Sequence, residues 1–266
     1  MKLAWYLLLS LGLPLTAWGP KGHRLAADGA LRTLPPNLRT WYLNREPEFT
    51  QASLEPDLWK ERDPAEATRH RIFCETYGGA ASVPVQASIA KQHVGAWAFE
   101  AGGQLPWVIA ERYRLLVRAF QGGDPKAVVA ASGWLCHYIA DAQVPLHTTR
   151  NRNGKETAQK GVHKRWETKL LERGVGEFQK PRSARASEDP SQAISTWILE
   201  SHGLVAPLLE ADRTAALQAG LGGASQAEHF WENQKTVVHQ QLQRSSEYTG
   251  DFLLSAWTAA GEPLHP

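Results

Sequence analysis

The segment from Trp134 to Glu167 constrains the fold most strongly, because it concentrates side chains that bind metals. It contains three histidines and two acids at ligand-like spacing, namely His137, Asp141, His147, His163 and Glu167. The first and last pairs, His137–Asp141 and His163–Glu167, are each four positions apart. On an α-helix this spacing places both side chains of a pair on one face, one turn apart. One such pair is common on solvated helix faces, but two pairs around a further histidine predict a site for Zn²⁺, which takes imidazole and carboxylate ligands.

The N-terminus has the pattern of a secretory signal peptide. Lys2 precedes an apolar run from Leu3 to Leu13, and the small residue Ala17 follows a few positions later. This run is too short to span a bilayer as a stable anchor. We therefore expect residues 1–17 to be removed, Trp18 to begin the mature chain, and the mature protein to be secreted or periplasmic. A membrane anchor or a buried first helix are the alternatives for this segment.

Residues 18–266 have the composition of one globular domain. Of the 266 residues, 42% are apolar and 21% are charged, which is enough apolar material for a sizeable core. The formal net charge of +2 excludes the strongly basic profile of a dedicated duplex-DNA-binding protein. No later segment reaches transmembrane length, so we expect no transmembrane segment in the mature chain. Nothing in the composition predicts an oligomeric state.

Apolar residues recur at helical spacing along most of the chain, which predicts an all-α domain of about six to eight helices with few strands, if any. Asp124 and Pro125 have the pattern of an N-cap followed by a first helical residue. We expect a loop over 150–161 and a surface connection over 174–190. The expected helices cover residues 23–34, 55–60, 86–101, 106–121, 125–143, 163–171, 190–209 and 225–260, and a break of the last one near Gly250 is left open.

The ligand-type residues also resemble a known family in their order and spacing. The matching features are W-G-x-x-G-H from Trp18 to His23, then Asp57 and His70, then H-x₃-D-x₅-H-x₁₅-H-x₃-E from His137 to Glu167. They resemble the zinc-dependent phospholipase C and S1/P1 nuclease superfamily, from Trp18 to about Leu171. This resemblance implies a secreted, single all-α domain around a trinuclear zinc cleft. The C-terminal third of the chain contributes nothing to it.

Three zinc sites follow from the resemblance. The first takes Asp57, His70, His137 and Asp141, and the second takes His147, His163 and Glu167. The third takes His23, Asp141 and the α-amino group and carbonyl oxygen of Trp18. Asp141 therefore bridges two ions, and the third site requires cleavage directly before Trp18. An α-amine has an ordinary pKa of roughly 8, so zinc can displace its proton near neutral pH.

Such a centre is suited to phosphodiester hydrolysis. Three Zn²⁺ ions and three carboxylate ligands leave an excess of about three positive charges, which attracts an anionic phosphate ester. A metal-bridged hydroxide is the expected nucleophile, and the metals stabilise the charge that develops on the oxygens. Asp57 is the expected catalytic residue, because it can also orient or deprotonate the attacking water. No nucleophilic serine or cysteine motif is present.

The sequence features favour two different classes of substrate. Glu167 and the short loop before His163 resemble the phospholipase branch, and Arg71 stands where the nucleases place an aromatic residue that stacks on a base. The spacing of Trp18 and His23 resembles the nucleases instead. We therefore expect phospholipase C-type activity on phospholipids, with transient contact to a membrane surface. The alternative is cleavage of single-stranded DNA, RNA and 3′-nucleotides, which gives a nucleic-acid partner.

Two further alternatives concern the zinc sites and the cysteines. A non-catalytic zinc-stabilised binding module predicts closed, four-coordinate sites without an exchangeable water. The only cysteines, Cys74 and Cys136, each lie near a predicted ligand of the first zinc site, His70 and His137. In an oxidising compartment they can form a disulfide, and two buried free thiols are the equal alternative.

Overall fold

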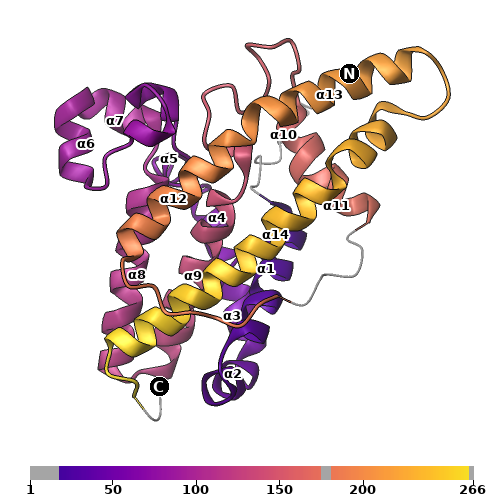
Figure 1. The fold of residues 1–266 in the computed structure, drawn as a ribbon. Helices are drawn as coiled ribbons and strands as arrows, with labels where there is room; N and C mark the ends of the chain where they lie inside the picture. Colours follow the sequence, from indigo (N-terminus) through magenta and orange to yellow (C-terminus); the bar gives the residue numbers. More distant parts are fainter. Residues whose placement is uncertain (1–17, 175–180, 264–266) are drawn as a thin grey trace, which may run out of the picture.

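The computed structural model describes residues 18–174 and 181–263, and all regular secondary structure in these ranges is helical (Figure 1). The all-α prediction is therefore confirmed. Six helices have 14 or more residues: α1 (Gly19–Thr33), α8 (Leu105–Gly122), α9 (Pro125–Ala142), α12 (Pro190–Gly203), α13 (Val205–Gly220) and α14 (Gln226–Ala259). The predicted signal peptide, residues 1–17, lies outside the described residues.

Shorter helices fill the connections between the long ones. The α-helical segments are α2 (Pro36–Leu43), α3 (Glu46–Ala52), α4 (Glu55–Trp59), α5 (Glu66–Arg69), α6 (Ala87–Val94), α7 (Ala96–Gly102), α10 (Val162–Lys164) and α11 (Leu170–Arg173). The 3₁₀ segments are η1 (Cys74–Tyr77), η2 (Ala80–Ser82) and η3 (Pro145–His147), and η4 (Arg165–Lys169) is a π-helical segment. These short segments bring the helix count above the predicted six to eight.

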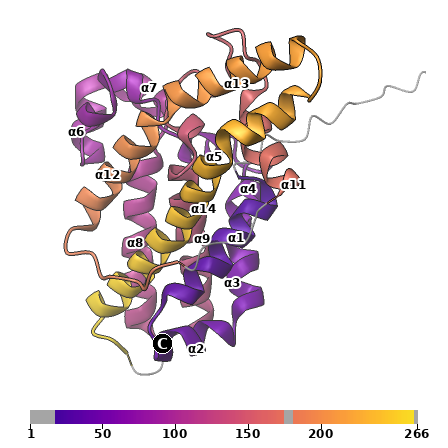
Figure 2. The same cartoon turned by 45° about the vertical axis from the view of Figure 1, so that its right-hand side comes forward.

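The centre of the molecule is α9, which packs against α1, α3, α8 and α14 (Figures 1 and 2). Only Gly123 and Asp124 separate α8 from α9, so the two helices form an antiparallel hairpin. The Asp124 side chain accepts a hydrogen bond from Lys126 N and Pro125 is the first helical residue, as predicted. Every residue of α9 from Leu135 to Ala142 is buried, so the predicted ligands on this helix point into the protein interior.

A second apolar cluster attaches the helix of His163 and Glu167 to the bundle. Trp166 and Leu170 pack in this cluster with Trp18, and side chains of α13 and α14 complete it. The Trp18 and Trp166 rings lie 5.0 Å apart between centroids. This packing places the helix that bears His163 and Glu167 beside the start of α1.

Two predicted helices differ from the structure in their continuity, and the structure decides the question left open for a third. The range 86–101 forms two helices, because Gly95 between α6 and α7 has a φ of 80° that interrupts the helix. The range 190–209 also forms two helices, since α12 ends at Gly203 and α13 begins at Val205 and continues to Gly220. In contrast, α14 continues unbroken through Gly250, where the absence of a side chain allows close approach of Thr33 on α1.

None of the helices in the described ranges combines the length and apolarity needed to cross a bilayer. The predicted loop over 150–161 is confirmed as a series of turns. Of the predicted surface connection, residues 175–180 lie outside the described residues, and residues 181–187 run along α14 through contacts with Glu247, Asp251 and Ser255.

Candidate metal centre

The structure brings together all eight side chains that the sequence predicted as metal ligands. They come from six parts of the chain: His23 in α1, Asp57 in α4, His70 directly after α5, His137 and Asp141 in α9, His147 in η3, and His163 and Glu167 in the helix from Val162 to Arg173. All eight are at most 8% exposed. Buried carboxylates and imidazoles in such number require partners, because burial without them is costly.

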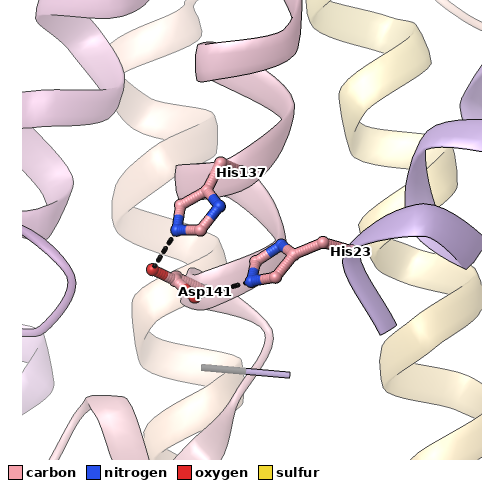
Figure 3. Close-up of side chains that lie close together, drawn as sticks. All are labelled: His23, His137 and Asp141. Carbon is pink, nitrogen blue, oxygen red and sulfur yellow. Dashed lines mark ion pairs between the residues drawn. The ribbon is translucent and has the colours of Figure 1, made fainter. Parts of the chain in front are cut away.

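Asp141 is the centre of the cluster, since its two carboxylate oxygens face four imidazole rings. Oδ2 lies 2.7 Å from His70 Nδ1 and 3.4 Å from His137 Nε2. Oδ1 lies 3.6 Å from His23 Nε2 and 3.6 Å from His147 Nδ1. Figure 3 shows His23 and His137 approaching this carboxylate from α1 and from one turn earlier in α9. The geometry therefore gives Asp141 access to more than one ion position.

The first group combines Asp57, His70 and His137. Asp57 Oδ1 lies 3.8 Å from His137 Nε2 and 3.9 Å from His70 Nδ1, and the two imidazole nitrogens are 3.0 Å apart. One ligand atom from each residue fits within 4.8 Å of the others, a spacing that can surround one cation. His23, His137 and Asp141 form a second group by the same measure.

The third group is made by His147, His163 and Glu167. Glu167 Oε1 contacts His163 Nε2 directly and lies 3.1 Å from His147 Nε2. Glu167 lies in the π-helical segment η4, so the helix is widened where it presents this carboxylate. Such π-helical turns are rare and occur frequently at functional sites. The i,i+4 spacing correctly predicted the contact of His163 and Glu167, but not this widening.

Several ligand-type atoms in the cluster are buried without any hydrogen-bond partner. They include Asp141 Oδ1 and ring nitrogens of His23, His147 and His163. Unpartnered buried polar atoms are uncommon in native proteins. A cation in each group gives these lone pairs a partner, so the residues present fit a metal centre. Nitrogen and carboxylate donors without thiolates are typical of zinc and related divalent metals.

The pKa values of His23 and Asp141 agree with a neutral imidazole and an ionised carboxylate, whereas Asp141 outweighs burial at His137 and raises the pKa of that ring. Burial, followed by the neighbouring His137, lowers the pKa of His23 to about 3, so its imidazole is neutral and able to donate a lone pair. Burial opposes ionisation of Asp141, but His137 and His147 outweigh it and hold the pKa of Asp141 well below its ordinary value. Both shifts favour the protonation states that metal ligation requires.

Two outer contacts orient the ligand rings, and neither was predicted from the sequence. His137 Nδ1 lies 2.8 Å from the Ser53 carbonyl oxygen, which leaves Nε2 to face Asp141 and Asp57. His70 Nε2 lies 3.3 Å from Glu66 Oε1, and Tyr138 donates a hydrogen bond to the same oxygen. Outer carboxylates and carbonyls of this kind fix the orientation of metal-binding histidines. Glu66 and His70 have i,i+4 spacing, so the signal for this pair was present in the sequence.

The sequence profile of the zinc dependent phospholipase C family matches residues 22–210. The chain belongs to this family. The matched range contains all eight ligand-type side chains of the centre, from His23 to Glu167. The phospholipase C resemblance is confirmed, and the match extends through α12 into α13, beyond the Leu171 limit expected from the motifs. No curated protein matches the chain.

Trp18 lies beside the centre of this phospholipase C family member. Its indole Nε1–H donates a hydrogen bond to the Ala140 carbonyl oxygen at 2.8 Å, and its side chain is buried. The residue directly precedes α1, so it is fixed close to the helix that carries His23. The predicted cleavage before Trp18 depends on residues 1–17, which are outside the described residues.

Cys74 and Cys136 are both buried and free, so the alternative of a disulfide between them is not realised. Burial raises the pKa of each thiol to about 12, which keeps both protonated. We assign them to the apolar core rather than to the metal centre.

Proposed function

We propose that this chain is a zinc-dependent hydrolase of phospholipid phosphodiesters, of the phospholipase C type. The observation that carries the proposal is the convergence of eight buried ligand side chains, with four imidazole rings around Asp141, in a chain of the zinc dependent phospholipase C family. The atoms without partners in this cluster support a role as ligands.

The proposed centre holds three zinc ions. Asp57, His70, His137 and Asp141 bind the first ion, and His147, His163 and Glu167 bind the second. His23 and Asp141 bind the third ion, together with the amine and carbonyl oxygen of Trp18. The two oxygens of Asp141 support its bridging role, because each faces a different pair of histidines. The three groups of mutually close ligand atoms support the number of ions.

Bound zinc supplies Lewis acidity, which polarises the phosphate ester and lowers the pKa of water. The residues of the chain hold the ligand set rigid, since every ligand is buried and packed on a helix or at a helix end. We assign Asp57 as the proton acceptor for the attacking water in addition to its ligand role. Burial opposes its ionisation, but His137 and Lys60 outweigh this effect and lower its pKa, so Asp57 is ionised at neutral pH.

Export of the protein is part of the proposal. Removal of residues 1–17 creates the α-amine of Trp18, and that amine completes the third ion site. The buried Trp18 side chain supports this role, because its hydrogen bond to Ala140 fixes the backbone beside α9. The proposed location is therefore outside the cytoplasm, either secreted or periplasmic.

Activity and metal content measured on one protein preparation test the function. The protein beginning at Trp18 is assayed for release of phosphorylated head group from phosphatidylcholine and for cleavage of single-stranded DNA, and its zinc is measured by mass spectrometry. We expect head-group release, no DNA cleavage and three zinc ions per chain. DNA cleavage without head-group release would transfer the chain to the nuclease class.

Two variants separate the metal centre from general damage to the fold. His137→Ala is expected to abolish head-group release and to lower the zinc content, because His137 belongs to two of the three groups. His229→Ala, outside the cluster in the first turn of α14, is the control and should retain both. Zinc-loaded wild-type protein without either activity would support a binding module instead, and an active His137→Ala would exclude the proposed centre.

A further inference from the structure

The segment between Thr76 and Phe99 is unusually poor in charge. It carries a single formal charge, Lys91, in 24 residues, whereas a chain that is 21% charged would place about five there. Lys91 lies 4.0 Å from Glu100, so the surface of this segment is close to neutral. A neutral surface loses little hydration energy when it enters a less polar environment.

The helices α6 and α7 and the residues just before α6 present apolar side chains to solvent. Trp97 is 83% exposed, Ile89 is 49% exposed and Val85 is 48% exposed. Within the part of the chain that the structure describes, Trp97 is the only aromatic residue whose side chain is largely exposed. Phe99 on the same short helix instead packs on Trp107 of α8, with 4.9 Å between ring centroids. Phe99 therefore anchors the inner side of α7 to α8, and this packing leaves Trp97 pointing into solvent.

This segment is tied to the metal centre through the backbone after His70. Phe73 N donates to Gly102 O, and Leu105 N donates to Arg71 O at 3.0 Å. Gly103 lies so close to Arg71 that an added Cβ would be 2.3 Å from the Arg71 carbonyl oxygen. Backbone hydrogen bonds thus connect the end of α7 directly to residues 71–73, which follow the proposed ligand His70.

The helix directions place α6 and α7 at the same end of the bundle as the metal centre. α8 begins directly after α7, and α9 runs antiparallel to α8 and ends one residue after Asp141. Both views show α6 and α7 standing out from the bundle beside the upper end of α8 (Figures 1 and 2). An object that contacts Trp97 therefore lies at the end of the protein where the ligands converge.

We propose that Val85, Ile89 and Trp97 form a docking surface that inserts into the interface of a phospholipid bilayer. The choice of a bilayer rests on the proposed phospholipase C function, whose substrate is a membrane lipid. It also rests on size, since three side chains bury far less than the roughly 1,000 Å² of a specific protein–protein interface. Tryptophan is enriched at membrane–water interfaces, and a few inserted apolar side chains give reversible attachment.

Vesicle binding by the zinc-loaded protein tests the docking surface without depending on hydrolysis when the lipid cannot be cleaved. The protein is sedimented with vesicles of a non-hydrolysable phosphonate analogue of phosphatidylcholine, and the bound fraction gives a partition coefficient. We expect Trp97→Ala to lower this coefficient by roughly tenfold to a hundredfold, because a large aromatic side chain no longer leaves water. Binding should depend weakly on salt, since the surface is close to neutral.

The matched control is Leu221→Ala, which removes an apolar side chain that is 89% exposed. Leu221 follows α13, in the connection to α14 that lies on the opposite side of the molecule from α6 in both views (Figures 1 and 2). Its loss should leave vesicle binding unchanged. Equal binding by wild type and Trp97→Ala, or equal losses in the two variants, would overturn the docking surface.

Kinetics on two substrates separate the docking surface from the proposed function. Trp97→Ala should reduce hydrolysis of vesicle phosphatidylcholine by the same factor as binding, and leave hydrolysis of a water-soluble short-chain phosphodiester unchanged. Equal losses on both substrates would show damage at the metal centre and would contradict the docking role. Trp97-dependent vesicle binding by a protein that hydrolyses neither substrate would refute the proposed function and retain the docking surface.

Discussion

Glu66 and His70 contact each other across one helical turn, with Glu66 Oε1 3.3 Å from His70 Nε2. The other nitrogen of the same ring, Nδ1, lies 2.7 Å from Asp141 Oδ2 in the centre of the cluster. His70 is therefore held from outside by one carboxylate while it faces the proposed metal centre on its inner side. Outer carboxylates of this kind set the tautomer, orientation and basicity of metal-binding histidines.

Removal of this outer carboxylate should weaken metal binding. We expect Glu66→Ala to lower zinc affinity at the His70 site by roughly 10- to 100-fold, and Glu66→Gln to cause a smaller loss. Competition with a chelator, followed by zinc mass spectrometry, measures the change. Glu111→Ala is the control. Glu66 and Glu111 both contact Arg69, but Glu111 is far more exposed and does not contact His70 in the structure. Unchanged zinc affinity in Glu66→Ala would exclude the positioning role.

The two-sided contacts of Asp141 predict a specific loss of metal. Asp141→Asn should remove two ions, because Asp141 is the proposed ligand that the first and third ions share. His163→Ala should remove one ion, because His163 contacts only the group of His147 and Glu167. Native mass spectrometry of the refolded variants counts the ions directly. Loss of one ion from both variants would contradict the bridging arrangement.

Arg165 and Asp212 form a bidentate ion pair that ties η4 to α13. Arg165 Nε lies 2.8 Å from Asp212 Oδ1, and its second guanidinium contact to Oδ2 is 2.7 Å long. Asp212 is 1% exposed, so Arg165→Ala leaves a buried carboxylate without its cation and should lower the free energy of unfolding by about 3–5 kcal/mol. Urea denaturation measures this change. The exposed pair of Arg213 and Glu210 is the control, and Arg213→Ala should cost less than about 1 kcal/mol.

The close approach of α1 and α14 at Gly250 makes this glycine sensitive to substitution. A Cβ added there would lie 1.8 Å from Thr33 Oγ1, so Gly250→Ala forces the two helices or the Thr33 side chain to move. We expect a net loss of about 1–3 kcal/mol despite the better helix propensity of alanine. Gly220→Ala, at a helical glycine with open space around it, should not lower the melting temperature. Thermal denaturation of the Gly250→Ala and Gly220→Ala variants is the measurement. A lower melting temperature in Gly250→Ala alone shows that steric crowding outweighs the gain in helix propensity.

His23 predicts how the stability of the metal-free protein depends on pH. Burial lowers its pKa to about 3, while in the unfolded chain it has its ordinary value of 6.5. Below pH 6.5 the unfolded state therefore binds a proton that the folded state does not bind, and stability falls as the pH falls toward 3. The expected contribution is about 2 kcal/mol between pH 6.5 and 5.

A comparison of wild type with His23→Gln isolates this effect. His137 acts in the opposite direction, because the neighbouring Asp141 outweighs burial and raises its pKa, so its contribution is present below pH 6.5 and is lost as the pH rises. The variant retains His137 and loses only the His23 contribution. Urea denaturation in chelator at pH 6.5 and 5 should show a smaller pH effect in His23→Gln, and equal pH effects would refute the assignment.

Local patterns in the sequence were enough to predict the helical class and the ligand-type residues from His137 to Glu167, whereas His23, Asp57 and His70 were assigned through the family resemblance. Helix periodicity, the cap at Asp124 and the i,i+4 spacing of His137 and Asp141 depend on residues within one or two turns of each other. The continuity of the helices was less predictable, because Gly95 breaks one helix and Gly250 lies within another. A glycine has the same local propensity in both places, and only packing against α1 explains the second.

The sequence by itself determined which residues have the chemistry to bind metal and which stretches form helices. The tertiary structure decided how the ligands meet, because His23, His70 and His147 reach Asp141 from segments that are distant in the chain. It also decided that Glu66 supports His70 and that Trp97 is exposed while Phe99 is buried. These features depend on how helices pack, and packing is set by contacts between residues that no local pattern connects.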